Sequence, residues 1–134
     1  MRRTTLFLAG TTAALLMVLF VSADAQAPTP FKRTVLQQGD LSTPGREVVQ
    51  ALAEIQPGAA SGRHTHPGEE IAYVLAGPVV LETDGKPAKT LQTGEVFLIP
   101  PGTVHNARNA GTGVAKVVAT YVIEKGKPVA TPVP

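Results

Sequence analysis

The chain has 134 residues, a formal net charge of +2 and no cysteine. This length fits one domain, and the small charge, with no run of Lys or Arg, argues against a nucleic-acid partner and for a small-molecule ligand. Because cysteine is absent, disulfide bonds and thiolate ligands are excluded, and any metal site must use nitrogen and oxygen atoms.

Residues 1–25 are predicted to be an export signal. Arg2-Arg3 gives a positive start, residues 6–21 are mostly apolar, and Ala23-Asp24-Ala25 offers small residues at a cleavage site. An uncleaved membrane anchor is the alternative, but the apolar stretch is shorter than the roughly 20 residues that span a bilayer. The arginine pair leaves twin-arginine export open. We expect a periplasmic or secreted protein, cleaved after Ala25, with no membrane partner afterwards.

The rest of the chain reads as short strands separated by turns. Val49, Ala51, Ala53 and Ile55 form an apolar face while Gln50 and Glu54 fall on the other, which predicts a strand over 47–55. Further strands are predicted at 31–36, 63–66, 70–76, 79–83, 88–91, 95–99, 105–107 and 114–123. Asp84-Gly85 predicts a hairpin with a two-residue turn.

This pattern predicts an all-β protein with no substantial helix in the mature domain, because no long window has a helical period. Residues 26–46 are assigned to a lead-in and first strand, and 47–124 to a small barrel, whose closure would remove exposed sheet edges. Residues 125–134 form a proline-rich tail that we expect to cross the surface without regular structure.

Four side chains in two segments predict a metal site. His64 and His66 are two residues apart, so they share one face of an extended strand, and Glu70 has the same parity. His105 follows in a second segment, behind Pro100-Pro101-Gly102. Three imidazoles and one carboxylate can coordinate a divalent transition metal ion.

The alternative is that the His-x-His pair is an ordinary polar pair on a strand. All three histidines of the chain fall in these two segments, which favours the metal site. Parity favours Glu70 over its neighbour Glu69 as the carboxylate ligand. Iron, manganese, nickel, copper and zinc all accept such ligands, so the identity of the ion stays open.

The two segments resemble the two sequence motifs of the cupin superfamily, in its small single-domain, type-2 form. Residues 58–77 match Gly, five residues, His-x-His, three residues, Glu, six residues and Gly, and residues 94–109 match the second motif up to its final Asn. The resemblance implies a jelly-roll β-barrel (a double-stranded β-helix) with the metal inside. It implies as ligands His64, His66, Glu70 and His105, and as structural positions Gly58, Gly77, Gly94, Pro100, Gly102 and Asn109.

Together with the predicted export signal, the resemblance gives as the leading hypothesis an exported metal-dependent enzyme, a dioxygenase acting on a small organic substrate. Glu70 is the candidate catalytic residue, as a ligand that detaches or accepts a proton. A non-catalytic binding module is one alternative. A decarboxylase, isomerase or lyase is another, which a cationic residue in the pocket would support. Fold alone does not decide between them.

Several side chains near the motifs have weaker assignments. Ala72 and Val74 share the parity of Glu70, so we expect them to line the pocket. Tyr73 and Tyr121 could each bring a hydroxyl to the site, but core packing is the favoured role.

Two arginines beside the ligand segments could meet a carboxylate substrate. For Arg63 and Arg108 the favoured reading is a solvated surface charge. We also expect a homodimer, formed through sheet edges or outer faces, in which the 31–36 strand or the tail could take part.

Overall fold

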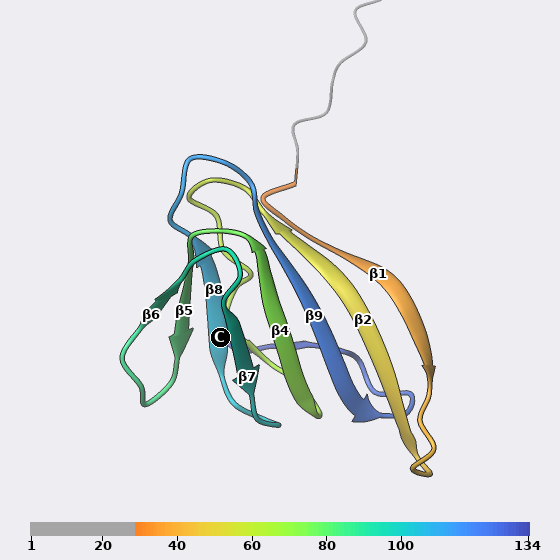
Figure 1. The fold of residues 1–134 in the computed structure, drawn as a ribbon. Coiled ribbons are helices and arrows are strands. Elements are labelled where there is room, and N and C mark those ends of the chain that lie inside the picture. Colours follow the sequence, from red (N-terminus) through yellow and green to blue (C-terminus); the bar gives the residue numbers. More distant parts are fainter. Residues whose placement is uncertain (1–28) are drawn as a thin grey trace, which may run out of the picture.

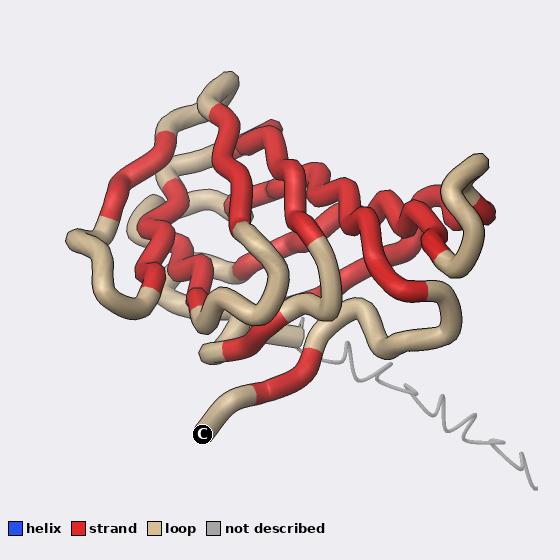
Figure 2. The backbone as a smooth tube through the Cα atoms, turned by 90° about the horizontal axis from the view of Figure 1, so that it is seen from below, coloured by secondary structure: helices blue, strands red, loops and turns tan. Residues whose placement is uncertain are grey.

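The structure, a computed structural model, describes residues 29–134. These residues form ten strands in two antiparallel five-stranded sheets and no helix (Figures 1 and 2). The first sheet contains, in spatial order, β1 (Phe31–Asp40), β2 (Arg46–Ile55), β9 (Ala115–Glu124), β4 (Glu69–Ala76) and β7 (Val96–Ile99). The second contains β10 (Thr131–Pro132), β3 (His64–Thr65), β8 (His105–Asn109), β5 (Val79–Thr83) and β6 (Lys89–Leu91).

The two sheets form a double-stranded β-helix, so the all-β prediction is confirmed. Within residues 29–134, no helix is long and apolar enough to cross a membrane. The predicted export signal at 1–25 lies outside the described residues. Export and a periplasmic or secreted location therefore stay predictions.

The core between the sheets is built from small aliphatic side chains. Along β9, every second residue from Ala115 to Ile123 is buried, with an exposed fraction of at most 3%. The predicted inward face of β2 is also observed, because Val49, Ala51 and Ile55 are buried and Ala53 packs against them. This two-residue period is the one that a strand with one buried face requires.

Asn109 ties three segments together at the end of β8. Its buried Nδ2 donates hydrogen bonds to the carbonyl oxygens of Ile55 (2.8 Å) and Gly113 (2.7 Å). Its Oδ1 accepts one from the backbone N–H of Gly111 (2.8 Å). A buried amide with these bonds made is stabilising, and its loss would leave buried backbone groups unpaired.

Apart from shifts of one or two residues at strand ends, the structure differs from the sequence predictions in three places. β1 extends to Asp40, because it pairs with β2 along almost its whole length. The β5–β6 hairpin has a longer connection than two residues, with the first ladder pair at Leu81 and Lys89. Pro87 lies in that connection and has no N–H to donate to a ladder. The tail is not irregular throughout, because β10 pairs with β3.

Exposed apolar side chains gather on the outer face of β4 and β7. Ile71 lies opposite Leu98, and Tyr73 opposite Val96, and all four are between 45% and 63% exposed. The prediction that Tyr73 packs in the core is therefore wrong, since odd-numbered residues of β4 point outward. Clusters of this kind often mark interaction sites. The homodimer stays a prediction.

Gly68 holds the turn between β3 and β4 against the end of β9. A Cβ atom at this position would lie 1.8 Å from the carbonyl oxygen of Val122, so no side chain fits without moving backbone. This turn also carries His66 on one side and Glu70 on the other.

We predict that Gly68→Ala lowers the free energy of unfolding by about 2 kcal/mol or more, because backbone must shift to admit the methyl group. Gly39→Ala is the matched control, since a Cβ there meets no heavy atom within 4 Å. Urea denaturation of the metal-free protein measures both variants. Equal stability of the two variants would contradict the close approach at Gly68.

Candidate metal centre

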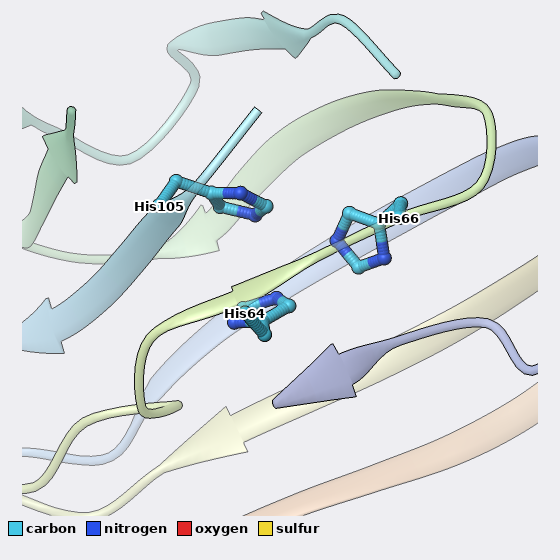
Figure 3. A group of neighbouring side chains, drawn as sticks. All are labelled: His64, His66 and His105. Atoms are coloured by element: carbon cyan, nitrogen blue, oxygen red, sulfur yellow. The ribbon is translucent and has the colours of Figure 1, made fainter. Parts of the chain in front are cut away.

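The three histidines meet in the interior, at one end of the second sheet. His64 on β3 and His105 on β8 are directly paired in the strand register, and His66 follows immediately after β3. Their exposed fractions are between 1% and 7%, and one ring nitrogen from each lies within 4.8 Å of the others. Figure 3 shows the three rings turned toward a common point.

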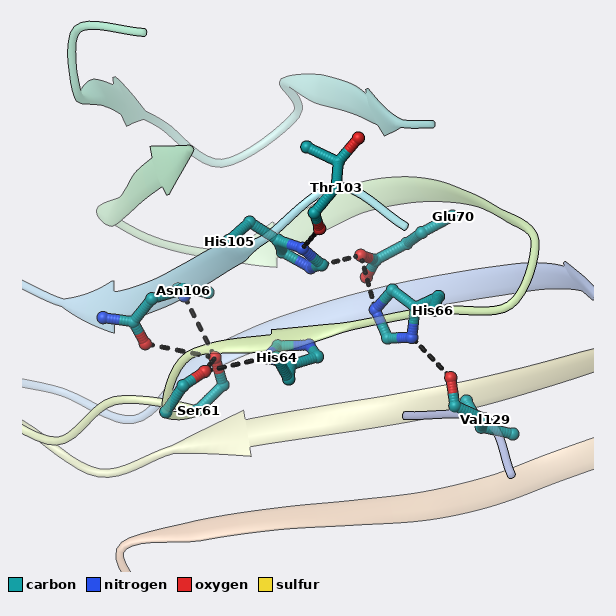
Figure 4. A network of polar contacts seen from close by, with 10 residues as sticks. Ser61, His64, His66, Glu70, Thr103, His105, Asn106 and Val129 are labelled. Carbon is teal, nitrogen blue, oxygen red and sulfur yellow. Dashed lines mark hydrogen bonds and ion pairs between the residues drawn. The ribbon is translucent and has the colours of Figure 1, made fainter. Parts of the chain in front are cut away.

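Backbone carbonyls fix the orientation of all three rings (Figure 4). Each Nδ1 lies at hydrogen-bond distance from a carbonyl oxygen: His64 from Gly62 (2.7 Å), His105 from Thr103 (2.9 Å) and His66 from Val129 (2.5 Å). A carbonyl oxygen only accepts, so each Nδ1 carries the hydrogen. In the neutral ring, each Nε2 then has a free lone pair, which is the form that binds a metal ion.

Glu70 reaches the same point from the opposite sheet. Its Oε2 lies 3.0 Å from Nε2 of His105 and 3.2 Å from Nε2 of His66, and the residue is 6% exposed. Burial raises the pKa of Glu70, but its close contacts with the imidazoles of His105 and His66 lower it by more, to about 2. The carboxylate is therefore ionised at neutral pH, as a cation ligand must be.

The donor set fits a divalent transition metal ion. Nε2 of His66 is buried and has no hydrogen-bond partner among residues 29–134, because its contact with Glu70 is poorly aligned. Burial, followed by the charges of His105, His66 and Arg33, lowers the pKa of His64 to about 4, although its bond to Gly62 acts in the opposite direction. His64 is thus neutral at pH 7. Nitrogen donors with a carboxylate suit iron, manganese, nickel, copper or zinc.

The free space beside the rings is small. The cavity that His64, Glu70 and His105 line has a volume of about 20 Å³, which is room for an ion or a water molecule. Ala72 and Val74 do not line it, so that prediction is wrong. Parity places them inward, as expected, and there they pack in the aliphatic core.

Tyr121 on β9 lines the cavity and packs against the ring of His66. The two ring centroids are 4.6 Å apart, and the tyrosine is 1% exposed. Burial and the neighbouring Glu70 charge raise the pKa of Tyr121, so its hydroxyl stays protonated. Core packing was the expected role and is confirmed. In addition, the ring forms a wall of the site.

The two arginines beside the ligand segments are both surface charges, which is the role that the sequence favoured for them. The guanidinium of Arg63 donates two hydrogen bonds to the carboxylate of Asp84, each 2.9 Å long. Nε of Arg108 lies 3.7 Å from Oε1 of Glu82. The cation that does line the cavity is Arg33 on β1, which the sequence analysis missed. In the sequence, Arg33 stands two residues after Phe31, so the two side chains share one face of the strand, and Phe31 also lines the cavity.

The carbonyl of Val129 was also missed. It belongs to the tail, just before β10, and it is the hydrogen-bond acceptor that orients His66. The pattern of the tail contains no strand signal that would have placed it near the site.

We predict that His64→Ala and His105→Ala each lower the affinity for Mn²⁺ or Zn²⁺ by at least about 100-fold, because removal of partners that only orient ligands already costs 10- to 100-fold. Calorimetric titration of metal-free protein, with the metal content measured by mass spectrometry, checks this. Stoichiometric binding of unchanged affinity in either variant would contradict the site.

The role of Glu70 as a fourth ligand stays a prediction, and Glu69 supplies its control. Glu70→Gln removes the buried charge and should weaken metal binding, whereas Glu69→Gln changes a carboxylate of opposite parity and should not. The same titration measures both. Equal affinities would show that Glu70 is not a ligand.

The sequence of residues 51–121 matches the Cupin domain family. Among curated proteins, a germin-like protein of Oryza sativa subsp. japonica is 39% identical over 79 residues, covering 55% of this chain and 37% of the relative. The transcriptional regulator PuuR of Escherichia coli (strain K12) is 32% identical over 79 residues, covering 58% and 42%. The matches therefore span about two fifths of the length of these relatives.

Solved structures show the same fold. A protein from Klebsiella pneumoniae with a double-stranded β-helix domain has a TM-score of 0.64 at 20% identity, covering 78% of this chain and 90% of that one. An oxalate oxidase in complex with glycolate has a TM-score of 0.63 at 23% identity, covering 81% and 63%.

A third solved structure is oxalate decarboxylase of Bacillus subtilis, described with Mn(II) centres. It has a TM-score of 0.56 at 21% identity, covering 64% of this chain and 24% of that one. The family match covers more than half of the chain and includes all four residues of the site. On this evidence the chain belongs to the cupin family.

Proposed function

We propose that this chain is an exported metalloenzyme that binds one divalent transition metal ion and acts on a small organic substrate, with a dioxygenase-like reaction as the leading form. The observation that supports this proposal is the convergence of three buried imidazoles whose Nδ1 atoms are bonded to backbone carbonyls, which leaves Nε2 of each ring as the metal-binding nitrogen. A bound ion would supply Lewis acidity and, if it is iron or manganese, redox chemistry with dioxygen.

The protein groups around this point have distinct roles. His64, His66 and His105 hold the ion, and the ionised carboxylate of Glu70 offsets part of its charge. Glu70 is also the candidate group to accept a proton from a substrate, since it lines the same cavity. Tyr121 and the aliphatic core exclude water from the other side, which strengthens each electrostatic interaction in the site.

Manganese is the first ion to test. A neighbour of the same fold is described with Mn(II) centres, and a carboxylate beside imidazoles suits this harder ion. Small organic acids belong in the substrate panel, because another neighbour binds glycolate.

A second reaction class is favoured by one observation, the cation in the cavity wall. Arg33 lines the space beside His64 and Glu70, where it could stabilise the negative charge of a carboxylate substrate. A metal-dependent decarboxylation, isomerisation or lyase reaction would use such a group.

The test is a comparison of oxygen consumption and product formation across metals. Metal-free protein is loaded with Mn²⁺, Fe²⁺, Ni²⁺, Cu²⁺ or Zn²⁺ and supplied with phenols, diketones and organic acids. We expect oxygen uptake with a redox-active ion that is lost in His105→Ala and retained in Glu69→Gln.

Substrate conversion without oxygen uptake would support the second reaction class. Metal-loaded protein that converts no member of the panel would contradict the enzymatic proposal and favour a non-catalytic binding module. Protein that takes up no metal would contradict the metal site itself.

A further inference from the structure

Arg33 occupies an unusual position for a charged residue on an outer strand. It pairs with Ala53 across β1 and β2, and neighbours in register share a face, so its side chain lies on the cavity side of the sheet. The guanidinium carbon lies 5.2 Å from the ring centroid of Phe31 and 5.8 Å from that of Tyr121. These two rings hold the cation beside the cavity.

Arg33 forms no ion pair with a carboxylate among residues 29–134, although Glu70 lines the same inner cavity. Nε of Arg33 is buried and has no hydrogen-bond partner among the described residues. Arg33 as a whole is only partly buried, but a buried donor atom without a partner is costly unless a ligand satisfies it.

A surface groove leads to this arginine from outside. It has a volume of about 230 Å³, and it shares Phe31, Arg33, Ser61 and His64 with the inner cavity. Within the described part of the chain, two arginines and no carboxylate line the groove. Because Asp84 holds the guanidinium of Arg63, the free positive charge in the groove is that of Arg33.

We propose that Arg33 binds the carboxylate group of a small organic anion in this groove and directs the rest of the molecule toward the three histidines. A guanidinium offers two parallel N–H donors that match the planar carboxylate. The inner cavity admits little more than an ion or a water molecule, so only the reacting end of the ligand enters it. The inference rests on the proposed function, since the anion is the substrate of the metal site.

The experiment compares propionate with propionamide, which have the same shape and differ in charge. Both are titrated into ¹⁵N-labelled protein, metal-free and Zn²⁺-loaded, and backbone shifts are followed by NMR. We expect saturable shifts with propionate around Arg33 and Ser61, at least about tenfold weaker binding in Arg33→Gln, an intermediate value in Arg33→Lys, and no saturable shifts with propionamide.

Arg108→Gln is the matched control, because this exposed arginine lies outside the groove. Its propionate affinity should equal that of the unchanged protein. The amide spectrum and thermal unfolding of Arg33→Gln show whether the fold is kept, and Arg33→Lys keeps the test valid if it is not. Equal propionate binding in Arg33→Gln, or equal binding of propionamide, would overturn the proposal.

A second readout places the ligand relative to the ion. In Mn²⁺-loaded protein, the methyl and methylene protons of propionate should relax faster than in Zn²⁺-loaded protein, and Arg33→Gln should abolish the difference. Arg33-dependent binding without this enhancement would overturn the claim that the groove leads to the metal site.

The two proposals fail in different ways. If the protein binds no metal but still binds propionate through Arg33, the proposed function fails and the anion site stands. If metal binds at the histidines but propionate affinity does not depend on Arg33, the anion site fails and the metal site stands.

Discussion

Three backbone carbonyls determine what the histidine cluster can do. A neutral imidazole has one donor and one acceptor nitrogen, and the acceptor turns inward only when something outside takes the hydrogen. The carbonyls of Gly62, Thr103 and Val129 do so for the three rings. Without these carbonyls the hydrogen of each ring could move from Nδ1 to Nε2. The same residues in the same place would then present N–H groups, which do not bind a cation.

The fold supplies those carbonyls from three separate segments. Gly62 precedes β3 and Thr103 precedes β8, while Val129 precedes β10, the outermost strand of the second sheet. The C-terminal tail is therefore part of the scaffold of the site. Opposite them, the close passage of Gly68 against β9 brings Glu70 back into the interior from the other sheet. Ligands on paired strands are held before any ion arrives, so little ordering remains to oppose binding.

The sequence allowed much of this arrangement to be predicted, for identifiable reasons. From the two-residue period of strands, the inward positions of His64 and Glu70 and the buried face of β2 could be predicted. The motif resemblance linked His105 to them, which spacing alone could not do. Parity gives the face on which a side chain lies but not what packs against it, and so Ala72 and Val74 were assigned to the cavity although they pack in the core.

Two features depended on contacts between distant segments. A charged residue on a first strand is usually expected to face solvent. Parity puts Arg33 on the same face of β1 as Phe31, and the pairing of Arg33 with Ala53 shows that this face meets the cavity. β10 has two residues, one of them a proline, so no local pattern could reveal it. Its position follows from the edge that β3 leaves for pairing.

The most direct test is anomalous diffraction from crystals of the full chain grown with Mn²⁺. One ion should lie at bonding distance, about 2.0–2.3 Å, from Nε2 of His64, His66 and His105, while each Nδ1 keeps its carbonyl partner. An ion bound elsewhere, or one held through Nδ1 or by fewer than three of these rings, would contradict the account.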